Sequence, residues 1–196
     1  IQGDIIALTD VSVVIVSPSG REKLNVQHGF KTPSMSVESG KFIVFNREGN
    51  KYKIFNKLGQ LYEGEAPYPI IDAVMGADGS YILVTGSRSY HTEVHLYNSS
   101  HLEVYKWFSA DNYAYKAAIK DDGSEFAVMT FNSEGGQIRS GIKTFNRKSD
   151  KPTGEIFIDN TALYALNYKL SDIIVIGDNK ALSLTSNAKL IKEYNY

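Results

Sequence analysis

The sequence predicts an all-β fold, a β-propeller of about five four-stranded antiparallel blades. Two observations predict this fold: turn-forming residues recur at intervals of about forty residues, and a run of apolar, strand-forming residues follows each turn. The composition agrees, because 13 Tyr and 9 Phe suit the half-buried faces of sheets. No window shows the 3.6-residue apolar stripe of an amphipathic helix, so we expect essentially no helix.

The recurring turn combines an acidic or polar residue, a Gly and a second polar residue. Gly40, Gly79 and Gly123 stand at equivalent positions, 39 and 44 residues apart, and a weaker copy without Gly follows at Ser171-Asp172. Glycine readily adopts the positive φ that a hairpin turn needs. A period in the low-to-mid forties with four strands per unit is typical of a propeller.

Four strands fill each period in the same order. A short strand with small residues precedes each turn, and the apolar run, a third strand and a mixed fourth strand follow it. Small side chains suit the innermost strands, which crowd around the propeller axis. The first blade lacks its first strand, so nineteen strands are expected. Together the blades make one domain, with approximate limits 1–30, 31–68, 69–113, 114–160 and 161–196.

Two aspects of this architecture stay open at the sequence level. Regular turn signals also occur in β-sandwiches, so a sandwich with irregular strands is the competing fold. The blades could close a small ring or form an arc of a propeller of about six to eight blades. The missing first strand favours a fragment or an incompletely closed ring, because a closed ring usually completes one blade with strands from both chain ends.

One stretch resembles the blade signature of the WD40-like and YVTN-like propeller superfamily. It is the run Asp-Gly-Ser-Tyr-Ile-Leu-Val at 78–84, with a looser copy at 122–128. The chain looks most similar to a propeller family of Gram-positive bacteria that is often membrane-tethered. The resemblance covers nearly the whole chain and implies blades, but no activity. The Trp-Asp dipeptide of true WD40 repeats does not occur, since Phe108 follows Trp107.

Composition argues against several classes of protein. A net charge of −1 with scattered Lys and Arg gives no reason to expect nucleic acid as a partner. With 0 Cys there is no disulfide framework, thiol catalysis or Cys-ligated zinc. No apolar run is long enough to span a membrane, and the sequence starts at Ile1, so we expect a cut or mature product whose anchor could lie upstream. We expect an extracytoplasmic or cell-surface bacterial location, with the cytoplasm as the alternative.

Two residue patterns could indicate a metal site, and each of them also has a simpler explanation. His91, Glu93 and His95 alternate along one strand and would share a face, where two of them could hold zinc. The simpler explanation is a solvated strand face, with Val94 and Leu96 packing on the other side. The acidic turns at 78–79 and 121–123 could suggest calcium, but turn chemistry explains them and no complete calcium loop is present. We therefore predict no metal and no cofactor.

The connections between blades are the predicted partner surface. Tyr68, Asp111, Asn112 and Tyr113 lie where a fourth strand passes to the next first strand. An exposed Tyr beside Asn and Asp suits a sugar or peptide contact. The simpler explanation is that each tyrosine covers the edge of its own blade.

The sequence favours a non-enzymatic binding or scaffolding module for an unidentified protein or glycan. The repeat architecture and the lack of catalytic motifs carry this prediction. The alternatives are a hydrolase or lyase with a polar site in the central channel, a sugar-binding surface module, or a structural spacer. Fold alone does not decide among these alternatives.

Overall fold

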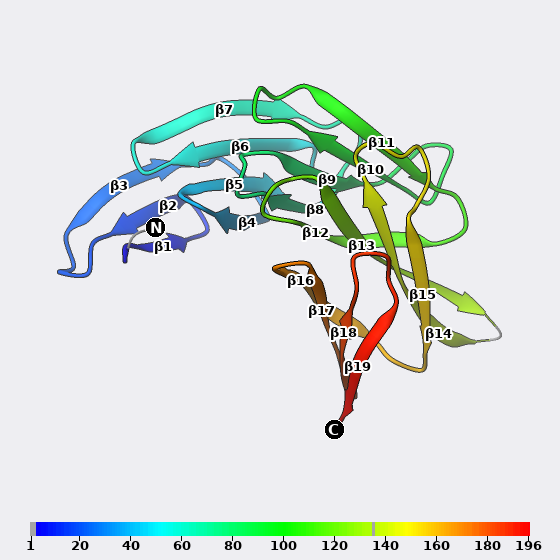
Figure 1. Ribbon diagram of the computed structural model, residues 1–196. Coiled ribbons are helices and arrows are strands. Elements are labelled where there is room, and N and C mark those ends of the chain that lie inside the picture. The colour runs from blue at the N-terminus through cyan, green and yellow to red at the C-terminus, as the bar shows by residue number, and fades with distance from the viewer. Residues whose placement is uncertain (1–2, 135) are drawn as a thin grey trace.

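The computed structural model describes residues 3–134 and 136–196, and all regular structure within them is β-strand (Figure 1). The described residues form nineteen strands in five antiparallel sheets, one of three strands and four of four strands. This confirms the all-β propeller prediction, including the first blade without its first strand. We call the sheets blades 1 to 5 in chain order.

The strands of each blade are as follows. Blade 1 contains β1 (Ile5–Leu8), β2 (Ser12–Val16) and β3 (Glu22–Gln27). Blade 2 contains β4 (Pro33–Glu38), β5 (Lys41–Asn46), β6 (Lys51–Asn56) and β7 (Gly59–Glu65). Blade 3 contains β8 (Ile70–Met75), β9 (Tyr81–Thr85), β10 (Thr92–Tyr97) and β11 (Glu103–Ser109). Blade 4 contains β12 (Tyr113–Ile119), β13 (Glu125–Glu134), β14 (Gln137–Asn146) and β15 (Gly154–Asp159). Blade 5 contains β16 (Leu163–Lys169), β17 (Asp172–Gly177), β18 (Lys180–Leu184) and β19 (Leu190–Asn195).

The blades follow one another along an arc, with blade 1 and blade 5 at its two ends (Figure 1). In every blade the strands pair in chain order, and the innermost described strands of successive blades contact each other: β1 with β4, β4 with β8, β8 with β12, and β12 with β16. This radial stacking of separate sheets excludes the sandwich alternative, which needs two sheets facing each other across one core. The molecule is a partial propeller.

The hydrophobic core is divided into layers between blades. Side chains alternate between the two faces of a strand, so each central strand serves two layers. In β9, Tyr81 and Leu83 pack against blade 2, whereas Ile82 and Val84 pack against blade 4. Further layers join blade 1 to blade 2 and blade 4 to blade 5. This two-sided burial explains why the second strands read as continuous apolar runs.

Hydrogen bonds also join neighbouring inner strands. The backbone N–H of Met75 donates to Ser36 Oγ at 3.2 Å, which links blades 3 and 2. The N–H of Ala117 donates to Asp72 Oδ2 at 3.2 Å, which links blades 4 and 3. Such bonds satisfy polar groups near the axis that strand pairing leaves free.

One expected loop is mostly strand. The sequence predicts a loop between strands at residues 132–137, yet β13 and β14 pair as far as Glu134 and Gln137, and Gly135 lies outside the described residues. Each of the two strands therefore contains ten residues, and a Gly-Gly dipeptide between strand-forming runs is a recognised hairpin signal in a sequence. The hairpin therefore reaches beyond the other hairpins of the molecule.

No helix in the described part of the chain has the length and apolar character needed to cross a lipid bilayer.

Packing between blades 4 and 5 predicts a sensitive glycine. A Cβ atom at Gly154 would overlap the carbonyl oxygen of Asn187, whose backbone has little room to move. We expect Gly154→Ala to lower the free energy of unfolding by about 1–3 kcal/mol, because overpacking forces the two blades apart. Chemical denaturation monitored by fluorescence measures this change.

Gly86→Ala is the matched control. The nearest atom to a Cβ at Gly86 is the Pro69 oxygen at 4.0 Å, an ordinary contact distance. This variant should change the free energy of unfolding by less than about 1 kcal/mol. Equal effects of the two substitutions would show that the blade 4–blade 5 contact is not the cause.

Candidate functional site

The connections between blades gather on one face of the propeller. In a four-stranded antiparallel blade, the loop between the second and third strands lies at the same end as the passage from the fourth strand to the next blade. Residues 66–69, 86–91 and 110–112 therefore share this face, together with the tip of the long β13–β14 hairpin. We call it the connection face.

Four aromatic rings form a patch on this face. Tyr113 at the start of β12 pairs with Phe131 on β13, and their rings stack with centroids 5.5 Å apart. His91 lies against Tyr113 at 4.3 Å, and Tyr115 meets Phe131 edge-on at 5.6 Å. Tyr113 and Phe131 remain 45% and 41% exposed, so the patch offers a broad aromatic surface to solvent. We call these four residues the aromatic patch.

An apolar groove of about 280 Å³ continues from the aromatic patch towards blade 5. It is lined by Tyr115, Phe131, Ile138, Ser140, Ala162 and Leu163. Its two hydroxyls are already used: Tyr115 donates to the Leu163 carbonyl at 2.8 Å, and Ser140 donates to the Thr161 carbonyl at 2.7 Å. The groove is slightly smaller than a typical small-molecule pocket and offers no charge. It fits one or two apolar side chains.

A second aromatic pair extends the surface over blade 3. Tyr90 lies 4.7 Å from Phe108, and both rings are exposed. The ammonium of Lys106 sits 5.5 Å above the Phe108 ring. Tyr90 adjoins His91 in the loop before β10, so this pair connects to the aromatic patch through that loop.

Only some of the residues predicted to form the partner surface are exposed on the connection face. Tyr113 and Asp111 are exposed on the connection face. Asn112 is buried, and its carbonyl accepts a 2.6 Å hydrogen bond from Ser109 Oγ, which holds the turn. Tyr68 is half-buried in the preceding blade connection, and no hydrogen bond or ring contact joins it to Tyr113.

Sequence reasoning missed Phe131, Ile138, Tyr90 and the stacking role of His91. Phe131 and Ile138 lie on β13 and β14, directly before and after the stretch 132–137 that the sequence predicts as a loop. The available signal was the Gly-Gly dipeptide, which predicts a tight hairpin whose flanking residues continue the strands. Contacts between rings of different blades have no signature in a single sequence.

The strand face with Glu93 and His95 is buried, so the expected solvated face is wrong. His95 is fully buried and its Nδ1 lies 2.8 Å from Glu103, while Nε2 lies 3.4 Å from Glu93. Lys106 is 3.8 Å from each glutamate. Burial lowers the pKa of His95, and the hydrogen bond to Glu103 acts in the opposite direction. The face carries a polar network within blade 3, in which His95 and Glu93 are buried while Glu103 and Lys106 reach solvent.

The zinc interpretation finds no support in this geometry. His91 is exposed against Tyr113, whereas His95 points into the interior. Val94 and Leu96 do pack on the opposite side of the strand, as expected, against blade 4. Within residues 3–134 and 136–196, no three His, Asp or Glu side chains are placed to hold a metal ion.

The acidic turns are explained by their own hydrogen bonds. Asp78 Oδ1 accepts the backbone N–H of Ser80 at 2.9 Å, and Asp122 Oδ1 accepts that of Ser124 at 2.9 Å. The bonds from Ser124 hold the pKa of Asp122 below its usual value. These are Asx turns of the kind that start hairpins.

The five radially stacked sheets define the class of this protein: it is a partial β-propeller. A family model named "Family of unknown function (DUF5711)" matches residues 1–196, so the chain belongs to that family. A search of curated proteins found no match.

Two solved structures are similar in fold. The Kuenenia stuttgartiensis hydrazine synthase matches with a TM-score of 0.75 and 12% identity, over 98% of this chain and 62% of that chain. The Neurospora crassa Pan2 WD40 domain matches with a TM-score of 0.68 and 14% identity, over 97% of this chain and 62% of that chain. At these identities the likeness establishes the propeller fold alone. The chain spans less than two thirds of each matched structure.

The buried network predicts a large cost for removing its central residue. His95→Ala would leave Glu93 buried beside Lys106 without the imidazole that separates it from Glu103. We expect a loss of about 2–4 kcal/mol in the free energy of unfolding, because buried charged groups lose a partner. Urea denaturation measures it.

His91→Ala provides the comparison, because His91 lies in the loop directly before the same strand. His91 is exposed and contacts only Tyr113 among the described rings, so its removal should cost less than about 1 kcal/mol. A ranking in which His91→Ala costs more than His95→Ala would refute the structural role of the network.

Proposed function

We propose that this chain is a non-enzymatic binding module that captures a protein partner through the aromatic patch and the apolar groove. An apolar or aromatic side chain of the partner inserts between the long β13–β14 hairpin and blade 5. The observation that carries the proposal is the exposure of Tyr113 and Phe131 directly beside a groove with no free polar group.

Exposed aromatic rings of this kind are typical anchors of protein interfaces. Tyr and Trp are enriched among residues that dominate binding energy, and such residues cluster around pockets that exclude water. Here the rings are held in place by stacking, since Tyr113 lies between His91 and Phe131. A preorganised surface loses little side-chain entropy on binding.

A glycan ligand is the second candidate, and the sugar-binding alternative rests on the same rings. Sugars need hydrogen-bond partners for their hydroxyls beside a stacking ring, and in this region Asp111 is exposed whereas Asn112 is buried. The scarcity of free polar groups around the groove favours a protein partner.

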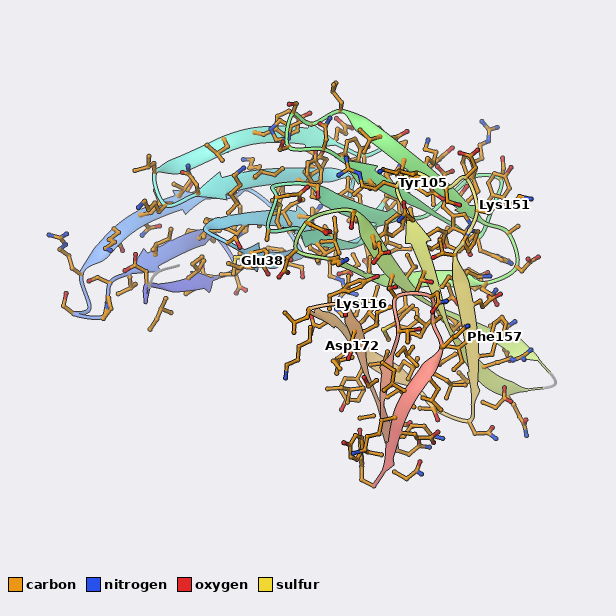
Figure 2. All side chains as sticks on the ribbon, in the orientation of Figure 1. Glu38, Tyr105, Lys116, Lys151, Phe157 and Asp172 are labelled. Carbon is orange, nitrogen blue, oxygen red and sulfur yellow. The ribbon has the colours of Figure 1, made fainter. Side chains whose placement is uncertain are left out.

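The hydrolase or lyase alternative would place its site in the channel. Burial raises the pKa of Asp72, and Lys116 opposes that rise. The Asp72 carboxylate, however, accepts the backbone N–H of Ala117 and thereby holds blades 3 and 4 together. Figure 2 shows Glu38, Lys116 and Asp172 along the inner side of the arc, a mixture of charges on three different blades. Asp72 is therefore better explained as a link between blades 3 and 4 than as a catalytic acid.

A position outside the cytoplasmic membrane, tethered by an anchor upstream of this chain, is part of the proposal. It is supported by the 0 Cys of the sequence and by the resemblance to a propeller family that is often membrane-tethered. The compartment stays a prediction.

Selection from a phage-displayed library of random peptides tests the proposal. Enriched peptides should carry an aromatic or aliphatic anchor, and Tyr113→Ala and Phe131→Ala should each weaken their binding by about tenfold or more in calorimetric titration. Tyr194→Ala removes an exposed ring on β19 and should leave binding unchanged. Peptide binding that ignores Tyr113 and Phe131 would refute the site.

A glycan array run in parallel separates the two candidate ligands. Binding to glycans alone, lost on Tyr113→Ala, would replace the protein partner with a sugar. Peptide binding without glycan binding supports the proposal as stated.

A further inference from the structure

We propose that the outer edge of blade 4 binds an extended peptide segment of a protein partner, which adds as an antiparallel fifth strand beside β15. The segment carries an aromatic or aliphatic residue, with one basic residue two positions before it and another two positions after it. The inference goes beyond the proposed function, because β15 contributes no residue to the aromatic patch or the apolar groove.

β15 has a free backbone edge. It is the last strand of its sheet, in the order β12-β13-β14-β15 (Figure 1), and among the described strands only β14 pairs with it. The N–H of Asn160 donates to the Ile138 carbonyl at 3.3 Å, which identifies the hydrogen-bonded positions of this pair. Because hydrogen-bonded and non-hydrogen-bonded pairs alternate, the N–H and C=O groups of Glu155, Phe157 and Asp159 point away from β14.

The regular pairing of β15 distinguishes it from the other outer strands. β3, β7, β11 and β19 each shift register once against the neighbouring strand, whereas the β14–β15 pair runs from Arg139–Asp159 to Thr144–Gly154 without a shift. A bulge twists an edge away from pairing with another chain, and Lys on an edge has a similar effect. β15 has no bulge and, with the sequence Gly-Glu-Ile-Phe-Ile-Asp, no Lys. A regular edge of this kind is a template for strand addition.

Phe157 provides an aromatic contact at the centre of this edge. It lies opposite Gly141 of β14, and a Cβ atom at Gly141 would be 3.3 Å from its ring, so the ring covers the glycine. The Arg139 guanidinium lies 4.2 Å from the ring centroid. The ring, labelled in Figure 2, remains 37% exposed. Since these contacts hold the ring in place, an apolar side chain opposite it would pack on a preorganised surface.

Two carboxylates flank Phe157 on the same face of the strand. Glu155 forms an ion pair with Lys143, and Asp159 Oδ1 lies 3.3 Å from Arg139 Nε. Both cations come from β14, one strand behind the edge, so β15 itself carries only negative charge. Side chains directly opposite each other on neighbouring strands interact, and opposite charges are favourable there. The geometry therefore favours Lys or Arg opposite Glu155 and Asp159.

The same carboxylates argue against a second copy of this chain as the occupant. In an antiparallel pair of β15 strands centred on Phe157, Glu155 of each strand would lie opposite Asp159 of the other. Like charges directly opposite each other destabilise a sheet. A partner strand with basic residues at these positions avoids this repulsion.

A groove on the opposite face of β15 lies between blades 4 and 5, and we call it the edge groove. It measures about 280 Å³. It is lined by four apolar residues and by an ion pair of 2.8 Å: Ile156, Ile158, Leu182 and Leu190, with Lys180–Glu193. Alternate side chains of an added strand point to opposite faces of the sheet, so those on this side would face the edge groove. The residues directly before and after the central apolar residue should therefore be aliphatic.

A short synthetic peptide tests the proposal. The probe contains Lys-Val-Phe-Val-Lys between two Thr residues, with blocked ends and a fluorescent label, and fluorescence anisotropy measures its binding to the full chain. We expect saturable binding that Phe157→Ala weakens by about tenfold or more. Phe108→Ala is the matched control and should leave binding unchanged. Phe108 is also an exposed ring beside a cation on an outer strand, but that strand contains a register shift.

Methylated peptide amides test the strand pairing without any change in the protein. In the antiparallel arrangement, the N–H of the peptide Phe points towards β15, whereas the N–H groups of both Val residues point away. N-methylation of the Phe should weaken binding by about tenfold or more, and N-methylation of one Val should leave it nearly unchanged. This pair of peptides decides the question even if Phe157→Ala fails to fold.

The absence of peptide binding up to about 1 mM would overturn the proposal. Equal binding of the two methylated peptides would do the same, and so would equal binding of a peptide with Glu in place of both Lys residues. Loss of binding in Tyr113→Ala, with no effect of Phe157→Ala, would place the peptide on the aromatic patch instead. A dimer in sedimentation that Phe157→Lys abolishes would show that a second copy occupies the edge.

Discussion

The burial of apolar strand faces between blades is the constraint on which this molecule depends. Each sheet is too thin to enclose a core, so it is stable only when neighbours cover both of its faces. The four layers between the five blades contain the large buried side chains of the described chain.

The candidate binding surface arises where one blade outgrows its neighbours. The β13–β14 hairpin continues beyond the point where blade 5 can cover it, which leaves Phe131 and Ile138 on an open sheet face. Tyr113 and His91 arrive at the same place through a blade connection and a hairpin loop. The surface is therefore a product of strand length and blade order, and both the aromatic patch and the apolar groove depend on the stiffness of the layers below them.

Polar residues show how much of a site a sequence can reveal. The alternation of Glu93 and His95 correctly placed both on one strand face, with Val94 on the other. The partners of that face could not be predicted, because Glu103 and Lys106 come from the next strand and meet Glu93 and His95 only through the strand register. Likewise Tyr113 was recognisable as a residue of a blade connection, whereas its stacking on Phe131 depends on the register of β12 with β13. Asn112 was predicted to belong to the partner surface. It is instead buried, and its carbonyl accepts a hydrogen bond from Ser109 within its own turn.

The sequence by itself determined the strand order, the turns and the repeat, because these depend on local rules: glycine in turns, alternation in strands and a period of about forty residues. The same rules identified the blade that begins with its second strand. Only the tertiary structure decided which strand faces are buried, which aromatic rings contact each other and where the apolar groove lies. Those properties depend on contacts between residues far apart in the chain, and a single sequence carries no record of distance in space.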